Sequence, residues 1–259
     1  MPLNSKTLGD KKNAMEFIGD PGLHLQDDLL SNLFRVRIFA NELMELYNLF
    51  NSRVDEVNKR ESKVFEDIGW PQPVMLMRNF GGRVTDVQLN LYFKSFVFIS
   101  RQSVEKILRS VYLARETLEH KSAAHKICDG SSPERFMKFI INVLEDKYSY
   151  DADVISMLKK HALTFIGLRM LRNNLKTLGT FNVVLLNKKP IIVIRLLEKD
   201  KQDTAYKYLS QWPHAKIEED KILKIDAVEV MKSIGKAIEE TGLCVEGRLN
   251  ITDESFDKL

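Results

Sequence analysis

The spacing of hydrophobic residues predicts long helices over most of this chain. From residue 25 onward, leucine, valine and phenylalanine recur at steps of three and four residues, the spacing of one helix face. Further helices are predicted over residues 85–119, with Thr85 as N-cap, over 132–147 and over 151–178. The breaks between them contain proline and glycine, which interrupt or end helices. The sequence therefore predicts a mainly α fold, a helical bundle with long antiparallel helices.

The pattern changes after residue 180. Residues 181–186 and 191–196 are β-branched runs that flank Asn187-Lys188-Lys189-Pro190, which predicts one small β-hairpin with a four-residue turn. A last helix is predicted from Asp226, as N-cap, to residue 241, with Gly242 as its stop.

These elements suggest three regions. Residues 1–24, which carry glycine, proline and charges but no apolar run, are predicted to be a flexible N-terminal arm. Residues 25–180 are predicted to form the helical bundle. Residues 181–259 then supply the β-hairpin and a C-terminal helix packed on the bundle.

The composition limits the cellular compartments and the binding partners that can be expected. The 259 residues carry 39 basic and 36 acidic side chains, a net charge of +3, so only a local cluster could predict nucleic-acid binding. Two cysteines, Cys128 and Cys244, form neither a disulfide framework nor a zinc motif. No signal peptide is predicted at the start, and no stretch reaches the ~20 apolar residues of a membrane span. We therefore expect a cytoplasmic protein without a membrane partner.

Several kinds of chemistry have no signature in the sequence. None of the five histidines pairs with another at the i, i+4 spacing of a helical metal site, so no metal is predicted. No phosphate-binding glycine loop and no Gly-x-Ser-x-Gly elbow occur, and no cofactor is predicted. His161, inside a predicted helix, is interpreted as a packed or surface histidine, with a catalytic role as the alternative.

One segment near the end of the 151–178 helix concentrates positive charge. Arg169, Arg172 and Lys176 follow i, i+3, i+7 spacing, which puts three cations on one helix face, and Asn173 adds a hydrogen-bonding amide. Each arginine can hold a phosphate with its planar fork. The alternative is a solvated basic face, in which Lys176 simply favours the negative end of the helix dipole.

Arg172-Asn173, followed by five residues and a glycine at the end of a bundle helix, resembles the motif of the HEPN superfamily. The resemblance implies a four- or five-helix bundle, a homodimer and, in many members, metal-independent ribonuclease activity in toxin–antitoxin, antiviral defence or RNA-processing systems. In that family an arginine binds phosphate and a histidine after it transfers protons. Here Thr177 occupies the position where the histidine is expected, and threonine does not titrate near pH 7.

The resemblance implies a phosphate or RNA site with Arg172, Asn173 and Thr177 at its centre and Arg169, Arg172 and Lys176 as nucleic-acid contacts. The protein would be either a metal-independent endoribonuclease or a degenerate, non-catalytic member that binds RNA or a nucleotide. It would dimerise through the helices at 85–119 and 151–178 and could have a cognate partner protein. The alternative function is a non-enzymatic helical dimerisation or scaffold protein.

Overall fold

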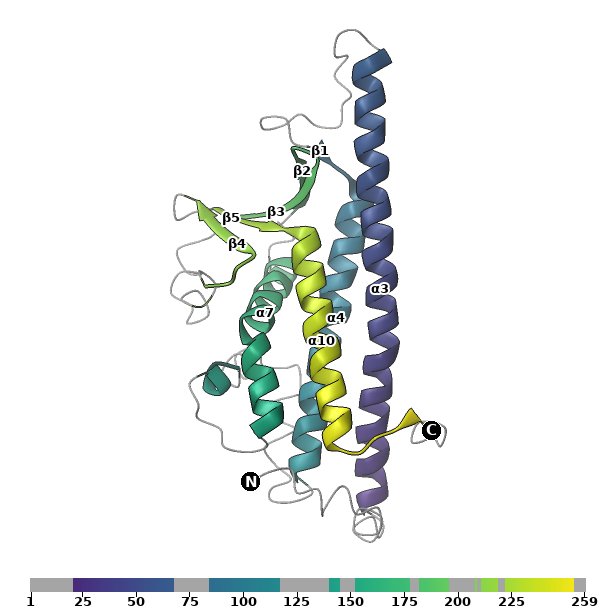
Figure 1. The fold of residues 1–259 in the computed structure, drawn as a ribbon, viewed down its shortest axis with the longest axis vertical. Coiled ribbons are helices and arrows are strands. Elements are labelled where there is room, and N and C mark those ends of the chain that lie inside the picture. The colour runs from purple at the N-terminus through teal and green to yellow at the C-terminus, as the bar shows by residue number, and fades with distance from the viewer. Residues whose placement is uncertain are drawn as a thin grey trace. The chain divides into compact units, whose positions relative to one another are not determined.

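The computed structural model describes residues 21–67, 84–116, 140–144, 152–177, 182–195, 208, 211–218 and 222–253. Four long helices dominate this part of the chain (Figure 1). They are α3 (Pro21–Asp67), α4 (Val87–Glu116), α7 (Ala152–Thr177) and α10 (Ala227–Arg248). The predicted mainly α fold is confirmed. Of the helix predicted at 132–147, only residues 140–144 are described, and they are helical.

A five-stranded antiparallel sheet accompanies the helices, in the order β1-β2-β3-β5-β4. Its strands are β1 (Val84–Thr85), β2 (Asn182–Leu186), β3 (Lys189–Arg195), β4 (Ala215–Glu218) and β5 (Ile222–Asp226). The predicted hairpin is β2–β3, and the other three strands extend it on both sides. Two of them, β1 and β5, pair with strands far away in sequence, and β4 is a four-residue edge strand that pairs only with β5.

The hairpin turn is tighter than predicted. Leu186 pairs with Lys189, so Asn187 and Lys188 alone form the turn, with φ of 50° and 65°. Positive φ at both central residues is the two-residue turn whose twist matches that of the flanking strands. Lys189 and Pro190 therefore belong to β3 and not to the turn. Pro190 is tolerated there because it lies near the start of the strand.

The start of α4 also differs from the prediction by one residue. Thr85 belongs to β1, and Asp86 caps the helix instead, because its Oδ1 accepts a hydrogen bond of 2.9 Å from the Leu89 N–H. At α10 the predicted cap is confirmed: Asp226 Oδ1 accepts from the N–H groups of Val228 and Glu229, at 3.0 and 3.2 Å.

The predicted end of α10 at Gly242 is wrong. The helix continues to Arg248 because Val245 and Leu249 are buried and prolong its apolar face, which offsets the ~1 kcal/mol cost of an internal glycine. The chain leaves the helical conformation at Asn250, two residues after the end of α10, where φ is 52°. The Asn250 N–H donates to the Gly247 carbonyl and the Ile251 N–H to the Glu246 carbonyl, the bonding pattern of a Schellman cap.

The chain divides into two compact units, and each long helix contributes to both. The first unit contains Met1–Asn41, Ser100–Arg169 and Lys236–Leu259, and the second contains Glu42–Ile99 and Met170–Gly235. The whole sheet lies in the second unit. The predicted three-region division stays a prediction, and residues 1–20 of its arm lie outside the described residues.

Each unit has its own apolar core. In the first unit the fully buried side chains come from all four long helices: Leu33, Val104, Ile107, Leu158, Phe165 and Val245. In the second unit they come from helices and sheet together: Phe50, Leu89, Phe93, Val183, Ile192, Leu223 and Ile234. No described helix is long and apolar enough to cross a membrane.

Candidate functional site

Helix α7 carries the residues predicted to bind phosphate, and its burial changes between Arg169 and Arg172. Between His161 and Leu171 all residues are buried except Leu163 and Met170, which are half-buried. From Arg172 to Leu175 every residue is half-buried. A helix enclosed on all sides is held firmly by its surroundings. Arg172 therefore begins the stretch in which every α7 residue of described burial is only partly buried.

Arg172 forms no hydrogen bond and no ion pair with the part of the chain that the structure describes. The residue is half-buried, and its guanidinium keeps all its donors for an external anion. Every other buried or half-buried arginine described has a polar partner: Arg37, Arg53, Arg101, Arg109, Arg169 and Arg248.

Arg169 lies in a different environment from the one predicted. Arg169 is only 9% exposed, and it takes part in a polar interaction within the protein. Arg169 therefore does not belong to a solvated basic face, and it does not line an open groove. Its assignment as a nucleic-acid contact stays a prediction.

The other residues of the predicted motif differ in how much of their surroundings the structure describes. Asn173 is half-buried and already has a polar interaction. Its neighbour Asn174 donates from Nδ2 to the Met170 carbonyl at 3.0 Å, so that amide satisfies the helix itself. Lys176 and Thr177 belong to the last turn of α7, and their side chains lie outside the described ones.

His161 is held inside the first unit by a residue that the sequence did not single out. Its Nε2 lies 2.7 Å from Glu240 Oε2 on α10, and Lys160 Nζ lies 2.6 Å from the same oxygen. These contacts, first that of Lys160 and then that of His161, lower the pKa of Glu240 to about 2. The histidine is thus packed, as interpreted, and its ring also lies against Phe165, 6.3 Å between centroids.

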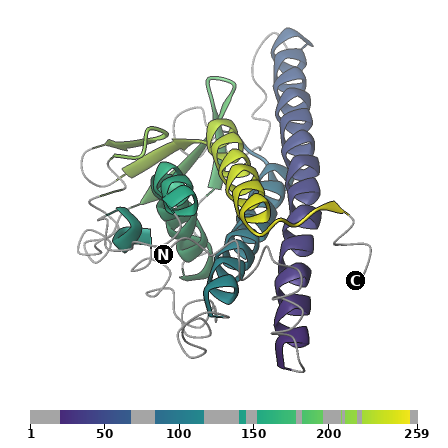
Figure 2. The same ribbon diagram turned by 60° about the horizontal axis from the view of Figure 1, so that its bottom comes forward.

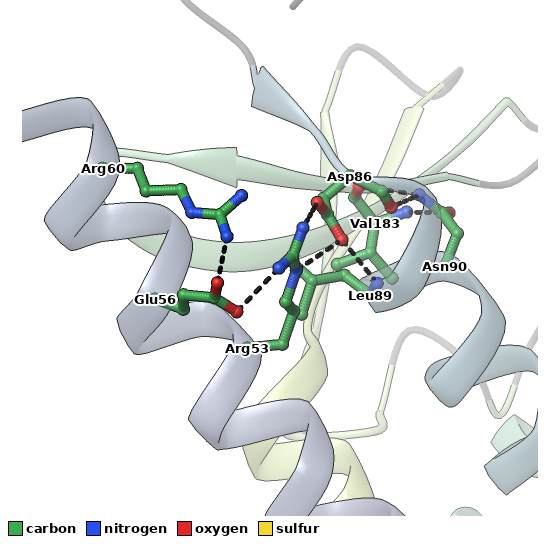
Figure 3. A network of polar contacts seen from close by, with 7 residues as sticks. All are labelled: Arg53, Glu56, Arg60, Asp86, Leu89, Asn90 and Val183. Carbon is green, nitrogen blue, oxygen red and sulfur yellow. Dashed lines mark hydrogen bonds and ion pairs between the residues drawn. The ribbon is translucent and has the colours of Figure 1, made fainter. Parts of the chain in front are cut away.

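The second unit contains a polar network that sequence reasoning missed (Figure 3). Arg53 on α3 makes a two-pronged contact with Asp86, with Nη2–Oδ2 at 2.7 Å and Nε–Oδ1 at 3.2 Å. Its Nη1 also donates to Glu56 at 2.7 Å, and Glu56 in turn pairs with Arg60. The hydrogen bond to Asp86 raises the pKa of Arg53. Burial acts to raise the pKa of Asp86, but the bonds from Arg53 and the Leu89 N–H outweigh it and lower that pKa.

Asn90 extends this network to the sheet. Its side chain donates to the Asp86 carbonyl at 2.8 Å and accepts from the Val183 N–H at 2.8 Å (Figure 3). The amide thereby pairs with β2 beside the two residues where β1 does so. The network fixes α3, the start of α4 and β2 together, which is a structural role.

Two further properties limit what the site can do. Within the described residues no three histidine, cysteine, aspartate or glutamate side chains gather as metal ligands would. The exposed side chains described on α7 are Asp153, Ser156, Lys159 and Lys160, all polar. The apolar residues of α7 whose burial is described are all buried or half-buried, and the dimer contact predicted through residues 151–178 stays a prediction.

Comparison of the chain with protein-family models, with curated proteins and with solved structures finds no match in any of the three.

Proposed function

We propose that the chain is a HEPN-like protein that binds RNA or a nucleotide through phosphate at the end of α7. Arg172 is the main anion-binding group, with Asn173 beside it and Lys176 in the next turn. The observation that carries the proposal is that Arg172, a half-buried residue, has no polar partner among the described residues. Its planar fork can hold two phosphate oxygens at once, and the enclosed part of α7 fixes the helix that presents it.

Binding is better supported than cleavage. Attack of a 2′-hydroxyl on phosphorus needs a group that exchanges protons near neutral pH. Thr177 has a hydroxyl that can hydrogen-bond a phosphate but does not titrate in that range. His161 is committed to Glu240. We therefore favour a non-catalytic, phosphate-binding member over an active endoribonuclease of a defence or toxin–antitoxin system.

The test is binding of a fluorescently labelled single-stranded RNA, measured in the presence of a metal chelator. Arg172→Ala should weaken binding about tenfold, the effect of losing one charge-assisted contact. Arg35→Ala is the matched control, because Arg35 is an exposed arginine on α3 without a described partner. Gel analysis of the same samples reports cleavage. Equal affinities for the wild type and Arg172→Ala would rule out the proposed site.

The second candidate function is a non-enzymatic dimerisation or scaffold protein. It is favoured by three large apolar side chains that are exposed on α4, those of Val87, Leu91 and Phe98. A stable dimer without RNA affinity at moderate salt would support this function over the first.

A further inference from the structure

The sheet of the second unit, seen in Figure 1 and from a second direction in Figure 2, has one buried face and one outer face. The buried face consists of apolar side chains that are at most 2% exposed: Val183, Ile192, Ile194, Leu223 and Ile225. Successive side chains of a strand alternate between the two faces, so the residues between these belong to the outer face. There Ile191, Val193 and Lys224 are half-buried, and Lys189 and Lys216 are exposed.

Two of the lysines on the outer face are direct neighbours. Lys216 of β4 is paired in register with Lys224 of β5, which puts their Cβ atoms about 5 Å apart. Like charges directly opposite each other on adjacent strands are unfavourable. Lys224 also takes part in an interaction within the protein, whereas Lys189 and Lys216 form no ion pair with the described part of the chain. An anion bound beside the two strands would offset the repulsion.

Protection of the sheet edge does not explain both lysines. A lysine on an edge strand keeps the sheet from pairing with another chain, and Lys216 lies on the edge strand β4. Lys224 does not, because β5 lies between β3 and β4. Asp226, the acidic residue of this face, is engaged in capping α10. The side chains of Arg195 and Glu218 lie outside the described ones, so among those described the outer face carries a net positive charge.

The two neighbouring lysines end a straight row that crosses the sheet from the strand following α7. The row consists of four residues, each directly opposite the next: Asn182, Val193, Lys224 and Lys216. It spans three strand spacings, about 14 Å. Asn182 comes five residues after Thr177, the end of α7, so their Cα atoms are at most about 18 Å apart. A chain of several nucleotides is therefore long enough to contact both Arg172 and this row.

The outer face fits a single strand better than a lone phosphate or a duplex. Lys189 and Lys216 are four residues and two strands apart, about 16 Å between Cα atoms, which favours a chain of phosphates over one. Ile191 and Val193 follow Lys189 on the same face and supply apolar surface between the cations. The bases of a single strand can lie on such side chains, whereas those of an RNA duplex are stacked inside the helix.

We propose that the outer face of the sheet binds single-stranded RNA, with phosphates at Lys189 and Lys216 and bases on the apolar residues between them. This inference rests on the proposed function and deepens it, because it makes the ligand an RNA chain of several nucleotides and not a mononucleotide. The surface belongs to the sheet and lies outside the helix that carries Arg172.

Charge reversal tests this surface through binding of a labelled single-stranded RNA of about 12 nucleotides. Lys216→Glu should weaken binding at least about tenfold, because a carboxylate then faces the phosphates. Lys59→Glu on α3 is the matched control, since Lys59 is exposed, has no described ion pair and gives the same change in net charge. It should change the affinity less than about twofold. Lys189→Ala combined with Lys216→Ala should reduce the magnitude of the salt slope by about 1.4, the value for two phosphates of a single strand.

Equal affinities of Lys216→Glu and Lys59→Glu would overturn the proposal, and so would equally tight binding of an RNA duplex of the same length. Circular dichroism of each variant separates loss of contact from loss of folding. Arg172→Ala in the same assay distinguishes the two sites. A loss of binding at Arg172 alone would remove the sheet surface and keep the proposed function, whereas a loss at the lysines alone would do the reverse.

Discussion

Two arginines of the second unit, Arg53 and Arg172, are both half-buried on long helices, and they differ in their polar contacts. Arg53 has carboxylates on two sides, from Asp86 and Glu56. Arg172 has no polar partner in the described part. Pairing makes the first arginine part of the scaffold, because its charge is already satisfied. The second retains the donors that an external anion needs. Burial alone therefore does not separate a structural arginine from a binding one, whereas the partner does.

The largest effect should come from removing the satisfied arginine. Arg53→Met leaves Asp86, a mostly buried carboxylate, without its main partner, and should lower the free energy of unfolding by about 3 kcal/mol. Urea unfolding followed by circular dichroism measures this. Arg35→Met, on the exposed side of α3, should change the same quantity by less than about 0.5 kcal/mol. If the two variants were equally stable, the network would contribute nothing to the fold.

The same substitution at Arg172 should not lower the free energy of unfolding. Arg172→Met keeps the length of the side chain and removes an unpaired charge, so it should leave the free energy of unfolding unchanged or raise it by up to ~1 kcal/mol. The same urea experiment measures it. A loss of more than ~1 kcal/mol would mean that Arg172 supports the fold and is not kept for a ligand.

The contact of Glu240 with Lys160 and His161 in the first unit should have a third, smaller effect on stability. This effect depends on pH, because the Glu240 carboxyl titrates. The folded pKa of Glu240 is about 2, below its ordinary value of 4.5. A lowered carboxylate pKa stabilises the fold above about pH 4.5, and this contribution disappears as the pH falls toward 2. The advantage in melting temperature of the wild type over Glu240→Gln should therefore shrink from pH 5 to pH 2.

Glu239→Gln is the control for this titration, since Glu239 is an exposed neighbour with no described ion pair. Its melting temperature relative to the wild type should not follow the same pH course. A constant difference between the wild type and Glu240→Gln over this pH range would count against the contact with Lys160 and His161.

The elements that the sequence predicted well are those with local signals. Helices α3, α4 and α10 follow apolar periodicity, and the Asp226 cap needs only the residues directly after it. The missed strands β1 and β5 depend on distant partners, such as Val84 opposite Leu185, and β4 is only four residues long and pairs with β5 alone. Gly242 was misread as a stop because the buried residues beyond it outweigh its weak helix propensity.

In the candidate site, too, the features with a local signal were predicted and those set by distant residues were not. The sequence identified Arg172 by its place in a short motif. It could not tell that Arg172 has no partner while Arg53 is paired with Asp86, a residue 33 positions away. Nor could it predict that His161 would be bound to Glu240, 79 positions away, or that Arg169 would be buried. Whether a charge is satisfied is a property of the packed structure and cannot be read from spacing alone.

The most direct test of the phosphate site is the salt dependence of RNA binding. Each phosphate contact releases counterions, so the slope of log affinity against log salt concentration reports how many contacts are made. Arg172→Ala should reduce the magnitude of this slope by about 0.7, the value for one phosphate of a single strand, while Arg35→Ala leaves it unchanged. An Arg172→Ala slope equal to that of the wild type would contradict the assignment of this guanidinium to phosphate.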